Sequence, residues 1–355
     1  MNVLLCERSL DGHRKIYLEQ LSSIPESVIY VYAPQNIGVK EGHYFKMEGT
    51  ENLKSVKNYV LWINCIKEIV KCCEIDIVHI LDGDGIMRYF GLGFLSWHVK
   101  KIVITYHHFF PGVIRKISYR FMNAGKNRVS VVHTESVRKR LVSIGIRNVV
   151  VCGYPGFKFS SIEELNAAKC KNLLGIPQNI ATIGIIGGMA PYKNILFFLR
   201  VLRKCKLRFH ILIAGKSNDW LFKDQLLDAI EPYKEKVTLI ERKLTDNEYE
   251  TAIAASNIIF CVYSREFDGA SGLLIDGVCA RKFILACKHG SLGEITSEYL
   301  LGLTAECDDE AEILNQTEIA LSRAIEFKYS EIANQYRESL RPEAFLRKYA
   351  QIYRT

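Results

Sequence analysis

Residues 181–202 read ATIGIIGGMAPYKNILFFLRVL, and this stretch decides the fold class. Its first six residues are mostly apolar and β-branched, which is typical of a buried parallel strand. Two glycines follow at once, and apolar residues recur at helical spacing from position 195. The stretch therefore predicts a strand, a glycine-rich turn and a helix, which together form one repeat of an α/β sheet.

The same alternation of apolar runs and helical patterns extends in both directions. A looser polar segment at 155–178 separates two series, and 355 residues suit two domains better than one core. We expect an α/β protein with two doubly wound Rossmann-like domains facing across a cleft, followed by C-terminal helices. The predicted strands are NVLLC (2–6), SVIYVY (27–32), DIVHIL (76–81), KIVITY (101–106), RVSVVH (128–133), NVVVC (148–152), ATIGII (181–186), RFHILIAG (208–215), KVTLIE (236–241), NIIFCVY (257–263) and KFILAC (282–287).

The boundaries that we predict are an N-terminal Rossmann-like domain at 1–162 and a C-terminal Rossmann-like domain at 163–335. A last helix at 336–355 is expected to pack back towards the N-terminal domain. In parallel sheets, ligands lie at the carboxyl ends of the strands, so the loops that follow the strands are where chemistry is expected.

Composition narrows the function classes. Hydrophobic residues make up 48% and charged residues 24%, the balance of a compact globule rather than a disordered chain. No apolar run is long enough to span a bilayer, and Glu7 and Arg8 interrupt any signal-peptide core. The 11 cysteines form no CxxC pair, which disfavours zinc sites and disulfides. We expect a cytoplasmic protein.

The positive charge is concentrated in the first half of the chain. The net charge of +8 divides into +7 for residues 1–165 (22 Lys and Arg against 15 Asp and Glu) and +1 for the remainder (25 against 24). Such a surface suits anions, although a merely solvated basic face remains an alternative. No recognition module for nucleic acid accompanies it, so we expect no nucleic-acid partner.

The turn that follows residues 181–186 has the chemistry of an anion site. Gly187 and Gly188 let the backbone approach a bulky group, the following helix start offers free amides, and Lys193 adds a full charge. A diphosphate would suit it. The alternative is a tight connection with a surface lysine, and the turn alone leaves both readings open.

A second loop, SREFDGASGLLID at 264–276, adds two carboxylates. Asp268 and Asp276 are separated by seven residues, so both can border one ligand while amides at the helix start, from Ser271, Gly272 and Leu273, point outward. Carboxylates beside a phosphate site commonly hold sugar hydroxyls. The alternative is that Asp268 caps the helix and Asp276 is a solvated helix residue.

These motifs together resemble the GT-B glycosyltransferases, specifically glycosyltransferase family 4. That family carries a Gly-Arg turn followed by a Lys, an acid and a second acid eight positions on, and an apolar segment with a Gly-rich turn before another acid. The equivalents here are residues 187–193, the pair Asp268 and Asp276, and HGSLGEI at 289–295, which contains Glu294. The order of DIVHIL, Thr105-Tyr106-His107, HTESVRKRL and VVVCGYPG extends the resemblance over nearly the whole chain.

The resemblance implies a role for each matched residue. Lys193 would bind the donor diphosphate, Gly272 and Leu273 would donate amides to it, and Asp276 would bind the ribose. The transferred sugar would be held by His107 and by Asp268 or Glu266, a choice that stays open. The loop at 241–244, with Arg242 and Leu244, would lie beside the base. Without the resemblance, a histidine at a strand end would be interpreted as a packing residue.

Two departures from the family pattern matter. Gly188 stands where the family has arginine, so Lys193 would need help from Lys216 or Arg265. Both acids are aspartates where glutamate is usual, and their contacts could therefore run through water.

The acceptor is expected on the N-terminal domain. In the loop after residues 2–6, Gly12, His13 and Arg14 are candidates for acceptor contact, with a capped surface loop as the alternative. The segment 106–122 mixes large apolar residues with Arg and Lys at helical spacing, and such a helix could lie on an anionic membrane. The alternative is a helix packed on its own sheet.

The implied activity is transfer of a hexose-like sugar from a nucleotide-diphosphate donor to a hydroxyl of a glycan or lipid-linked acceptor, with retention, in cell-surface polysaccharide biosynthesis. We expect no cofactor and no metal, with the protein peripheral at the inner face of the cell membrane. The alternatives are a sugar-nucleotide 2-epimerase and a non-catalytic GT-B partner of another transferase.

Overall fold

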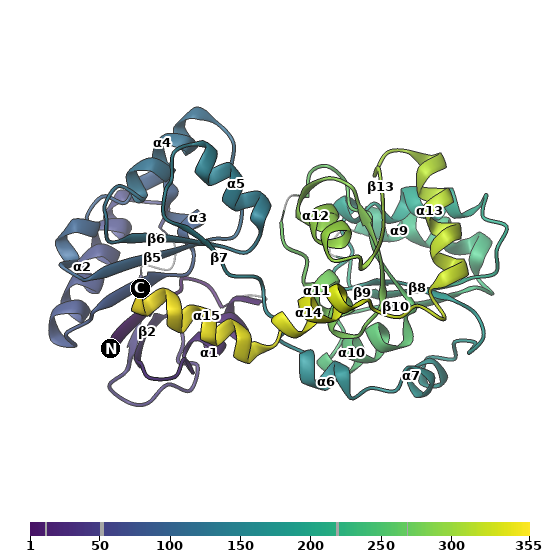
Figure 1. The fold of residues 1–355 in the computed structure, drawn as a ribbon, viewed down its shortest axis with the longest axis horizontal. Helices are drawn as coiled ribbons and strands as arrows, with labels where there is room; N and C mark the ends of the chain where they lie inside the picture. The colour runs from purple at the N-terminus through teal and green to yellow at the C-terminus, as the bar shows by residue number, and fades with distance from the viewer. Residues whose placement is uncertain (11–12, 50–52, 218–219, 268) are drawn as a thin grey trace. The chain divides into compact units, whose positions relative to one another are not determined.

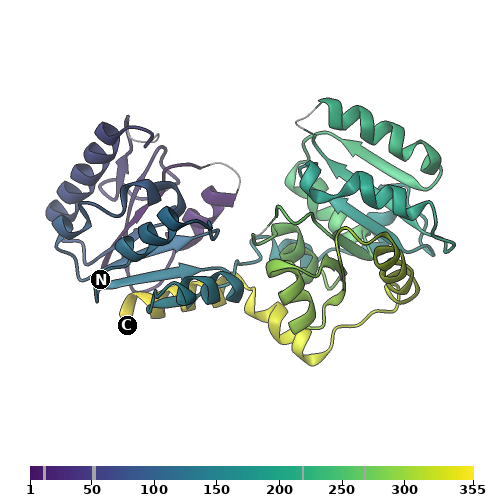
Figure 2. The same cartoon turned by 90° about the horizontal axis from the view of Figure 1, so that it is seen from above.

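The computed structural model describes residues 1–10, 13–49, 53–217, 220–267 and 269–355. It consists of two compact units. The N-terminal unit comprises residues 1–153 and 342–355, and the C-terminal unit comprises residues 154–341. Each is built around its own parallel sheet (Figures 1 and 2).

The sheet of the N-terminal unit has seven parallel strands in the order β3-β2-β1-β4-β5-β6-β7. The chain order reverses between β1 and β4, which lie side by side with Val3 opposite Ile77. The central strands β1, β4, β5 and β6 are buried along almost their whole length, as expected of strands that are covered on both faces. The strands are β1 (Asn2–Cys6), β2 (Val28–Ala33), β3 (Tyr44–Lys46), β4 (Ile77–Ile80), β5 (Lys101–Tyr106), β6 (Arg128–Val132) and β7 (Val149–Val151).

The last helix of the chain belongs to the N-terminal unit, where it packs against the first helix (Figure 1). The hydroxyls of Tyr17 and Tyr349 hydrogen-bond there, and Lys101 Nζ donates to the carbonyl of Ile352 at 2.8 Å. The helices of the unit are α1 (His13–Leu21), α2 (Val56–Cys72), α3 (Gly83–Ile86), η1 (Met87–Tyr89), η2 (Phe94–Trp97), α4 (Val113–Met122), α5 (Glu135–Ser143) and α15 (Pro342–Arg354).

The sheet of the C-terminal unit has six parallel strands in the order β10-β9-β8-β11-β12-β13. Its chain order reverses between β8 and β11, where Ile183 pairs with Ile258. The strands are β8 (Thr182–Ile186), β9 (His210–Gly215), β10 (Val237–Glu241), β11 (Ile258–Cys261), β12 (Phe283–Cys287) and β13 (Gly302–Ala305).

Helices of the C-terminal unit gather in two groups. α8, α9 and α13 pack together, as do α6, α7, α10 and α11. The helices are α6 (Phe159–Glu163), α7 (Ala167–Leu173), η3 (Pro191–Lys193), α8 (Ile195–Leu202), α9 (Trp220–Ile230), η4 (Glu231–Tyr233), α10 (Asp246–Ala255), α11 (Gly272–Cys279), α12 (Gly290–Glu298), α13 (Glu310–Arg323) and α14 (Glu331–Ser339). A buried Arg337 on α14 bonds Glu163 of α6 at 2.7 Å.

The prediction of two Rossmann-like sheets followed by C-terminal helices is confirmed, and each predicted strand is present with small shifts at its ends. Two short edge strands, β3 and β13, were not predicted. Within the part of the chain that is described, no helix is both long enough and apolar enough to cross a bilayer.

Candidate functional site

In a doubly wound sheet, ligands bind where the strand order reverses, at the carboxyl ends of the two strands concerned. In the C-terminal unit these strands are β8 and β11. The loops that follow them are the two that the sequence singled out. The topology therefore brings the glycine turn with Lys193 beside the loop that begins at Ser264.

The turn after β8 requires glycine at more than one place. Gly187 has φ 88°, a conformation that favours glycine. A Cβ on Gly215, at the end of the neighbouring β9, would lie 1.9 Å from the carbonyl oxygen of Gly187. By contrast, a Cβ on Gly188 would meet no atom within 4 Å. The position where the family carries arginine is therefore open space.

Lys193 ends the short η3 turn and is only 7% exposed. Its Nζ donates a hydrogen bond of 2.7 Å to the carbonyl of Ile186 and lies 5.9 Å from the ring centroid of Tyr263. No carboxylate among the described residues forms an ion pair with it. Burial therefore lowers the pKa of this amine to about 8. A cation held out of water without a counter-charge is poised to take an anion.

The loop after β11 is joined to the same turn. The backbone N–H of Ser264 donates to the carbonyl of Tyr192 at 2.7 Å, and the rings of Tyr192 and Phe267 stack at 5.3 Å. Ser271 caps α11, because its hydroxyl accepts the N–H of Leu274. The alternative in which Asp268 is the cap is therefore wrong, and Asp268 itself lies outside the described residues.

Helix α11 begins at Gly272, so the amides of Gly272 and Leu273 belong to its first turn. Amides in a first helical turn have no partner within the helix, and they carry the positive end of its dipole. Ser271 is buried at the helix start. This end of α11 therefore has the backbone donors expected of a phosphate site.

Asp276 lies within α11 and is only 6% exposed, so its interpretation as a solvated helix residue is wrong. The hydroxyl of Tyr249 on α10 donates to its carboxylate at 2.8 Å. Burial raises the pKa of Asp276 to about 6, although this hydrogen bond acts in the opposite direction. A carboxyl with a raised pKa accepts hydrogen bonds when it is ionised and can donate one when it is protonated.

The remaining candidate cations of this unit are placed differently. Arg265 pairs with Glu306 at 2.9 Å and with Asp308 at 3.1 Å, and Arg242 pairs with Glu248. Both side chains are exposed, and their charge is already matched. Lys216 is exposed just after β9, and its carbonyl accepts the N–H of Met189 at 3.0 Å. Lys193 and Lys216 are thus the candidate cations of this unit for which the described residues form no ion pair.

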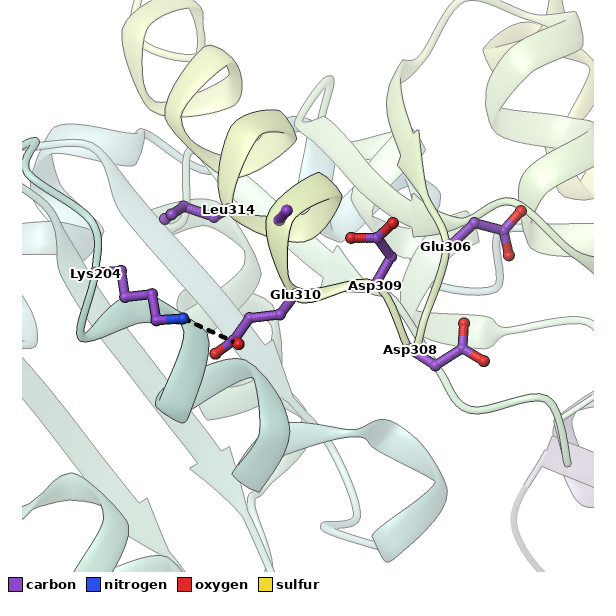
Figure 3. Close-up of a pocket in the computed structure, with 7 residues that line it drawn as sticks. Lys204, Glu306, Asp308, Asp309, Glu310 and Leu314 are labelled. Atoms are coloured by element: carbon purple, nitrogen blue, oxygen red, sulfur yellow. Dashed lines mark hydrogen bonds and ion pairs between the residues drawn. The ribbon is translucent and has the colours of Figure 1, made fainter.

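Two further candidate site residues and one hollow of the C-terminal unit remain to be placed. Glu266 is exposed, and Leu244 packs partly buried against the core. Beside the acidic partners of Arg265 lies a hollow of about 580 Å³, in which Lys204 pairs with Glu310 at 3.0 Å (Figure 3). Its lining is predominantly acidic, so it does not suit a diphosphate.

In the N-terminal unit the strand order reverses between β1 and β4, and a buried charge cluster lies in the loops that follow them. Arg14 bonds Asp82 at 2.9 Å and Glu7 at 3.1 Å, and Arg8 also bonds Asp82. Burial would raise the pKa of Asp82, but the two guanidinium groups outweigh it and hold the pKa below its usual range. Burial raises the pKa of Glu7 to about 7.

Asp84 holds the loop that carries the candidate histidine. Its Oδ2 accepts the backbone N–H of His107 at 2.8 Å and of His108 at 3.2 Å. Its Oδ1 is buried and has no hydrogen-bond partner in the described structure. Burial raises the pKa of this carboxyl to about 7. A neutral carboxyl with a free oxygen could donate a hydrogen bond to a ligand near neutral pH.

The ring of His107 is engaged at both nitrogens. Nε2 lies 2.9 Å from the carbonyl oxygen of Leu81, and Nδ1 lies 3.2 Å from Nε2 of His133. Burial lowers the pKa of His107 to about 4. Of the acceptor candidates, Arg14 lies in the charge cluster and His13 begins α1. Gly12 and the side chain of His13 lie outside the described residues.

Sequence reasoning missed Glu7, Arg8, Asp82 and Asp84. The signal was present in DGDG at 82–85, since two acids and two glycines directly after a buried strand are typical of a functional loop. What the sequence could not show is that Arg14 and Asp82 meet, because 68 positions separate them.

No protein-family model matches the sequence, and no curated protein matches it. Solved structures do. A glycosyltransferase from Rickettsia africae is 19% identical with a TM-score of 0.80, over 99% of this chain and 97% of that one. HepE of Anabaena, in complex with UDP, is 12% identical with a TM-score of 0.71, over 99% of each chain.

Sucrose-phosphate synthase of Thermosynechococcus elongatus is 14% identical with a TM-score of 0.72, over 100% of this chain and 98% of that one. These neighbours are GT-B glycosyltransferases. The chain has the GT-B fold. The fold that the sequence motifs implied is thus confirmed for both units.

Proposed function

We propose that this protein is a glycosyltransferase whose C-terminal unit binds the diphosphate of a nucleotide-sugar. The observation that carries the proposal is Lys193, a cation that is 7% exposed, unpaired with any described carboxylate and placed at the switch point of the sheet. Such a site costs stability in the free protein, and an anion would remove that cost. The first-turn amides of Gly272 and Leu273 lie in the neighbouring loop region.

The mechanism follows from this charge. In the transfer step, the bond between the anomeric carbon and the phosphate oxygen breaks as the acceptor oxygen bonds to that carbon. Lys193 and the α11 amides stabilise the charge that grows on the leaving diphosphate. Since these groups can supply that stabilisation, we propose a metal-independent reaction. In a reaction with retention, the departing phosphate oxygen takes the acceptor proton.

The donor class is supported by a neighbour. HepE of Anabaena has been solved with UDP, with UDP and glucose and with UDP-glucose. We therefore propose a hexosyl nucleotide donor for this chain. Asp276 would bind the ribose, Arg242 and Leu244 would lie beside the base, and Asp268 or Glu266 would hold the sugar together with His107. Lys216 would assist Lys193, since Arg265 is already neutralised.

The acceptor is assigned to the N-terminal unit, where Arg14 lies in the charge cluster after β1. One structural neighbour is described as a lipopolysaccharide outer core galactosyltransferase, at 11% identity and a TM-score of 0.72. This likeness supports a glycan or lipid-linked acceptor and a role in cell-surface polysaccharide biosynthesis.

Peripheral attachment to an anionic membrane is supported by α4. Val113, Ile114 and Phe121 are 74%, 71% and 59% exposed, and Ile117 is 39% exposed. Positions 113, 114, 117 and 121 form one stripe of the helix, whereas the face that packs on the unit carries Ser118, Tyr119 and Met122. The apolar stripe is therefore not packed on its own sheet. Exposed Arg115, Lys116 and Arg120 on the same helix suit anionic headgroups at the inner face of the cell membrane.

The test is incubation of the purified protein with UDP-, GDP- and ADP-sugars and a lipid-linked acceptor. Release of nucleotide identifies a transferase, and an isomerised donor identifies a 2-epimerase. No reaction with any of the donors favours a non-catalytic partner. Lys193→Ala should lower turnover by about one to three orders of magnitude. Lys204→Ala, which removes an exposed lysine paired with Glu310, is the matched control.

A further inference from the structure

A hollow in the N-terminal unit lies at the amino-terminal ends of its strands, opposite the ends that carry the candidate site residues. It occupies about 430 Å³ beside the first residue of β6, where α4 and α5 end. The candidate residues His107 and His133 follow the last residues of β5 and β6, so a strand length separates the two places. Its lining consists of Arg120, Asn123, Ala124, Gly125, Lys126, Arg128, Gly145, Ile146, Arg147 and Asn148.

The lining of this hollow is strongly basic. Arg120, Lys126, Arg128 and Arg147 contribute four positive charges, and none of the described residues that line it is acidic. No described carboxylate forms an ion pair with any of these four side chains. Concentrated charge of one sign in a concave surface raises the local concentration of counter-ions.

Arg128 makes this hollow more than a solvated basic surface, because its side chain is buried. It is 5% exposed, and its Nη1 donates to the carbonyls of Phe121 and Met122 at 2.8 and 2.9 Å. Its Nε is buried without a hydrogen-bond partner. Burial lowers the pKa of this guanidinium. A buried guanidinium with an idle donor and no carboxylate lacks a partner that an anion would supply.

Gly125 borders the side chain of Arg128. Gly125 has φ 151°, and a Cβ there would lie 3.4 Å from Nε of Arg128. The carboxyl termini of α4 and α5 bring the negative ends of two helix dipoles to this hollow. An arginine caps each of them: Nη1 of Arg128 donates to the carbonyl of Phe121 on α4, and Nε of Arg120 donates to the carbonyl of Ile144 after α5, both at 2.8 Å. Four full charges exceed two half-charges, so the hollow stays positive.

We propose that this hollow binds a phosphate group, carried as a monoester on a larger molecule. A phosphomonoester brings close to two negative charges and three acceptor oxygens, which matches several guanidinium and ammonium donors better than a single carboxylate does. A volume of about 430 Å³ exceeds a bare phosphate and suits a small organic ligand. The phosphate could come from a soluble metabolite or from a lipid headgroup.

The test compares two double variants by titration calorimetry with inorganic phosphate and with glycerol phosphate. Lys126→Glu with Arg147→Glu reverses two exposed charges of the hollow. Lys57→Glu with Lys67→Glu makes the same change in net charge on exposed positions of α2. We expect the first pair to weaken binding at least about tenfold, since each lost charge-assisted contact is worth that much. The control pair should bind as the wild type does.

Equal affinity in both pairs, or no phosphate binding by the wild type, would overturn the proposal. Binding of UDP, measured by thermal shift, reports on the C-terminal unit. A lack of phosphate binding in the hollow can therefore be distinguished from a failure of the proposed function. Vesicles of phosphatidylcholine with either phosphatidic acid or phosphatidylglycerol identify the source. A preference for phosphatidic acid that the hollow variant loses assigns the phosphate to a lipid. Binding of glycerol phosphate without that preference assigns it to a soluble ligand.

Discussion

Nδ1 of His107 and Nε2 of His133 lie 3.2 Å apart, one residue beyond the paired ends of β5 and β6. The outer nitrogens of the two rings face the carbonyl oxygens of Leu81 and Cys152, at 2.9 and 3.0 Å. Because a carbonyl only accepts, the outer nitrogens carry the hydrogens, and both inner nitrogens carry lone pairs while the rings are neutral. A hydrogen bond between the rings therefore requires an added proton.

The dependence of protein stability on pH should report on this pair of histidines. Burial lowers the pKa of His107 to about 4 and of His133 to about 3, well below the unfolded value of roughly 6.5. The unfolded chain therefore binds more protons in this window, and the pair loses stability as the pH falls below about 6.5. Glu7 and Asp84, with raised pKa values, act in the opposite direction. The difference between variants is thus the informative quantity.

His133→Gln should gain about 1 kcal/mol of unfolding free energy relative to wild type between pH 7.5 and pH 5.5, because the neutral amide does not titrate. Urea unfolding at both pH values measures it. His98→Gln, at an exposed position, should not produce this difference between the two pH values. If the two variants show the same pH dependence, His133 is not held neutral by burial.

Lys193→Met should make the free protein more stable while removing activity. Burial lowers the pKa of Lys193 to about 8 from the usual 10.5. Between these two pH values the unfolded state therefore binds more protons than the folded state does. At pH 7 the lysine is charged in both states, and keeping that charge buried lowers the free energy of unfolding. Allowing for the lost hydrogen bond to Ile186, we expect a gain of about 1–3 kcal/mol. Thermal unfolding and donor turnover measure the two effects, with Lys204→Met as control. Loss of both stability and turnover would indicate a structural lysine instead.

The strands of both units were predictable because a strand buried on both faces is a continuous apolar run. β3 and β13 were not, since each is a short edge strand of three or four residues with half-exposed positions. The turn that carries Lys193 and the start of α11 were predictable as local structure, because glycine turns and helix starts are local signals. The hydrogen bond from Tyr249 to Asp276 is not local, so the sequence could not show it, although the apolar run GLLIDGVC around Asp276 did carry a signal of burial.

That hydrogen bond can be tested with Tyr249→Phe. The change leaves a buried carboxyl without its donor, so we expect a loss of about 1–3 kcal/mol in stability at pH 7. The pKa of Asp276, already raised to about 6 by burial, should rise further. In the folded variant Asp276 then has a pKa further above its unfolded value of about 3.9. Protonation at lower pH therefore stabilises the folded variant more than the wild type, and the loss of unfolding free energy should shrink as the pH falls towards 5. A loss that is independent of pH would mean that Asp276 does not titrate with folding.

Membrane attachment through α4 is tested by sedimentation with phosphatidylglycerol vesicles. Changing Arg115, Lys116 and Arg120 together to Glu should reduce binding severely, since each basic residue near an anionic surface contributes about 1 kcal/mol. Ile114→Ser with Phe121→Ser removes apolar area from the exposed stripe and should weaken binding at high salt too. Binding by the charge-reversed variant equal to that of wild type would remove the membrane proposal.

Gly188→Arg should strengthen donor binding. Glycine occupies the place where the resembled family carries a diphosphate-binding arginine, and a Cβ here meets no atom within 4 Å, so the backbone and its neighbours accept the change. An added guanidinium beside Lys193 would offer a second full charge and a bidentate donor, and we expect nucleotide diphosphate to bind about tenfold more tightly. Calorimetry with UDP and GDP measures it. Gly188→Gln adds a shorter polar side chain without charge and should have little effect. If arginine weakens binding or both variants behave alike, the diphosphate does not lie over this turn, and the assignment of Lys193 fails with it.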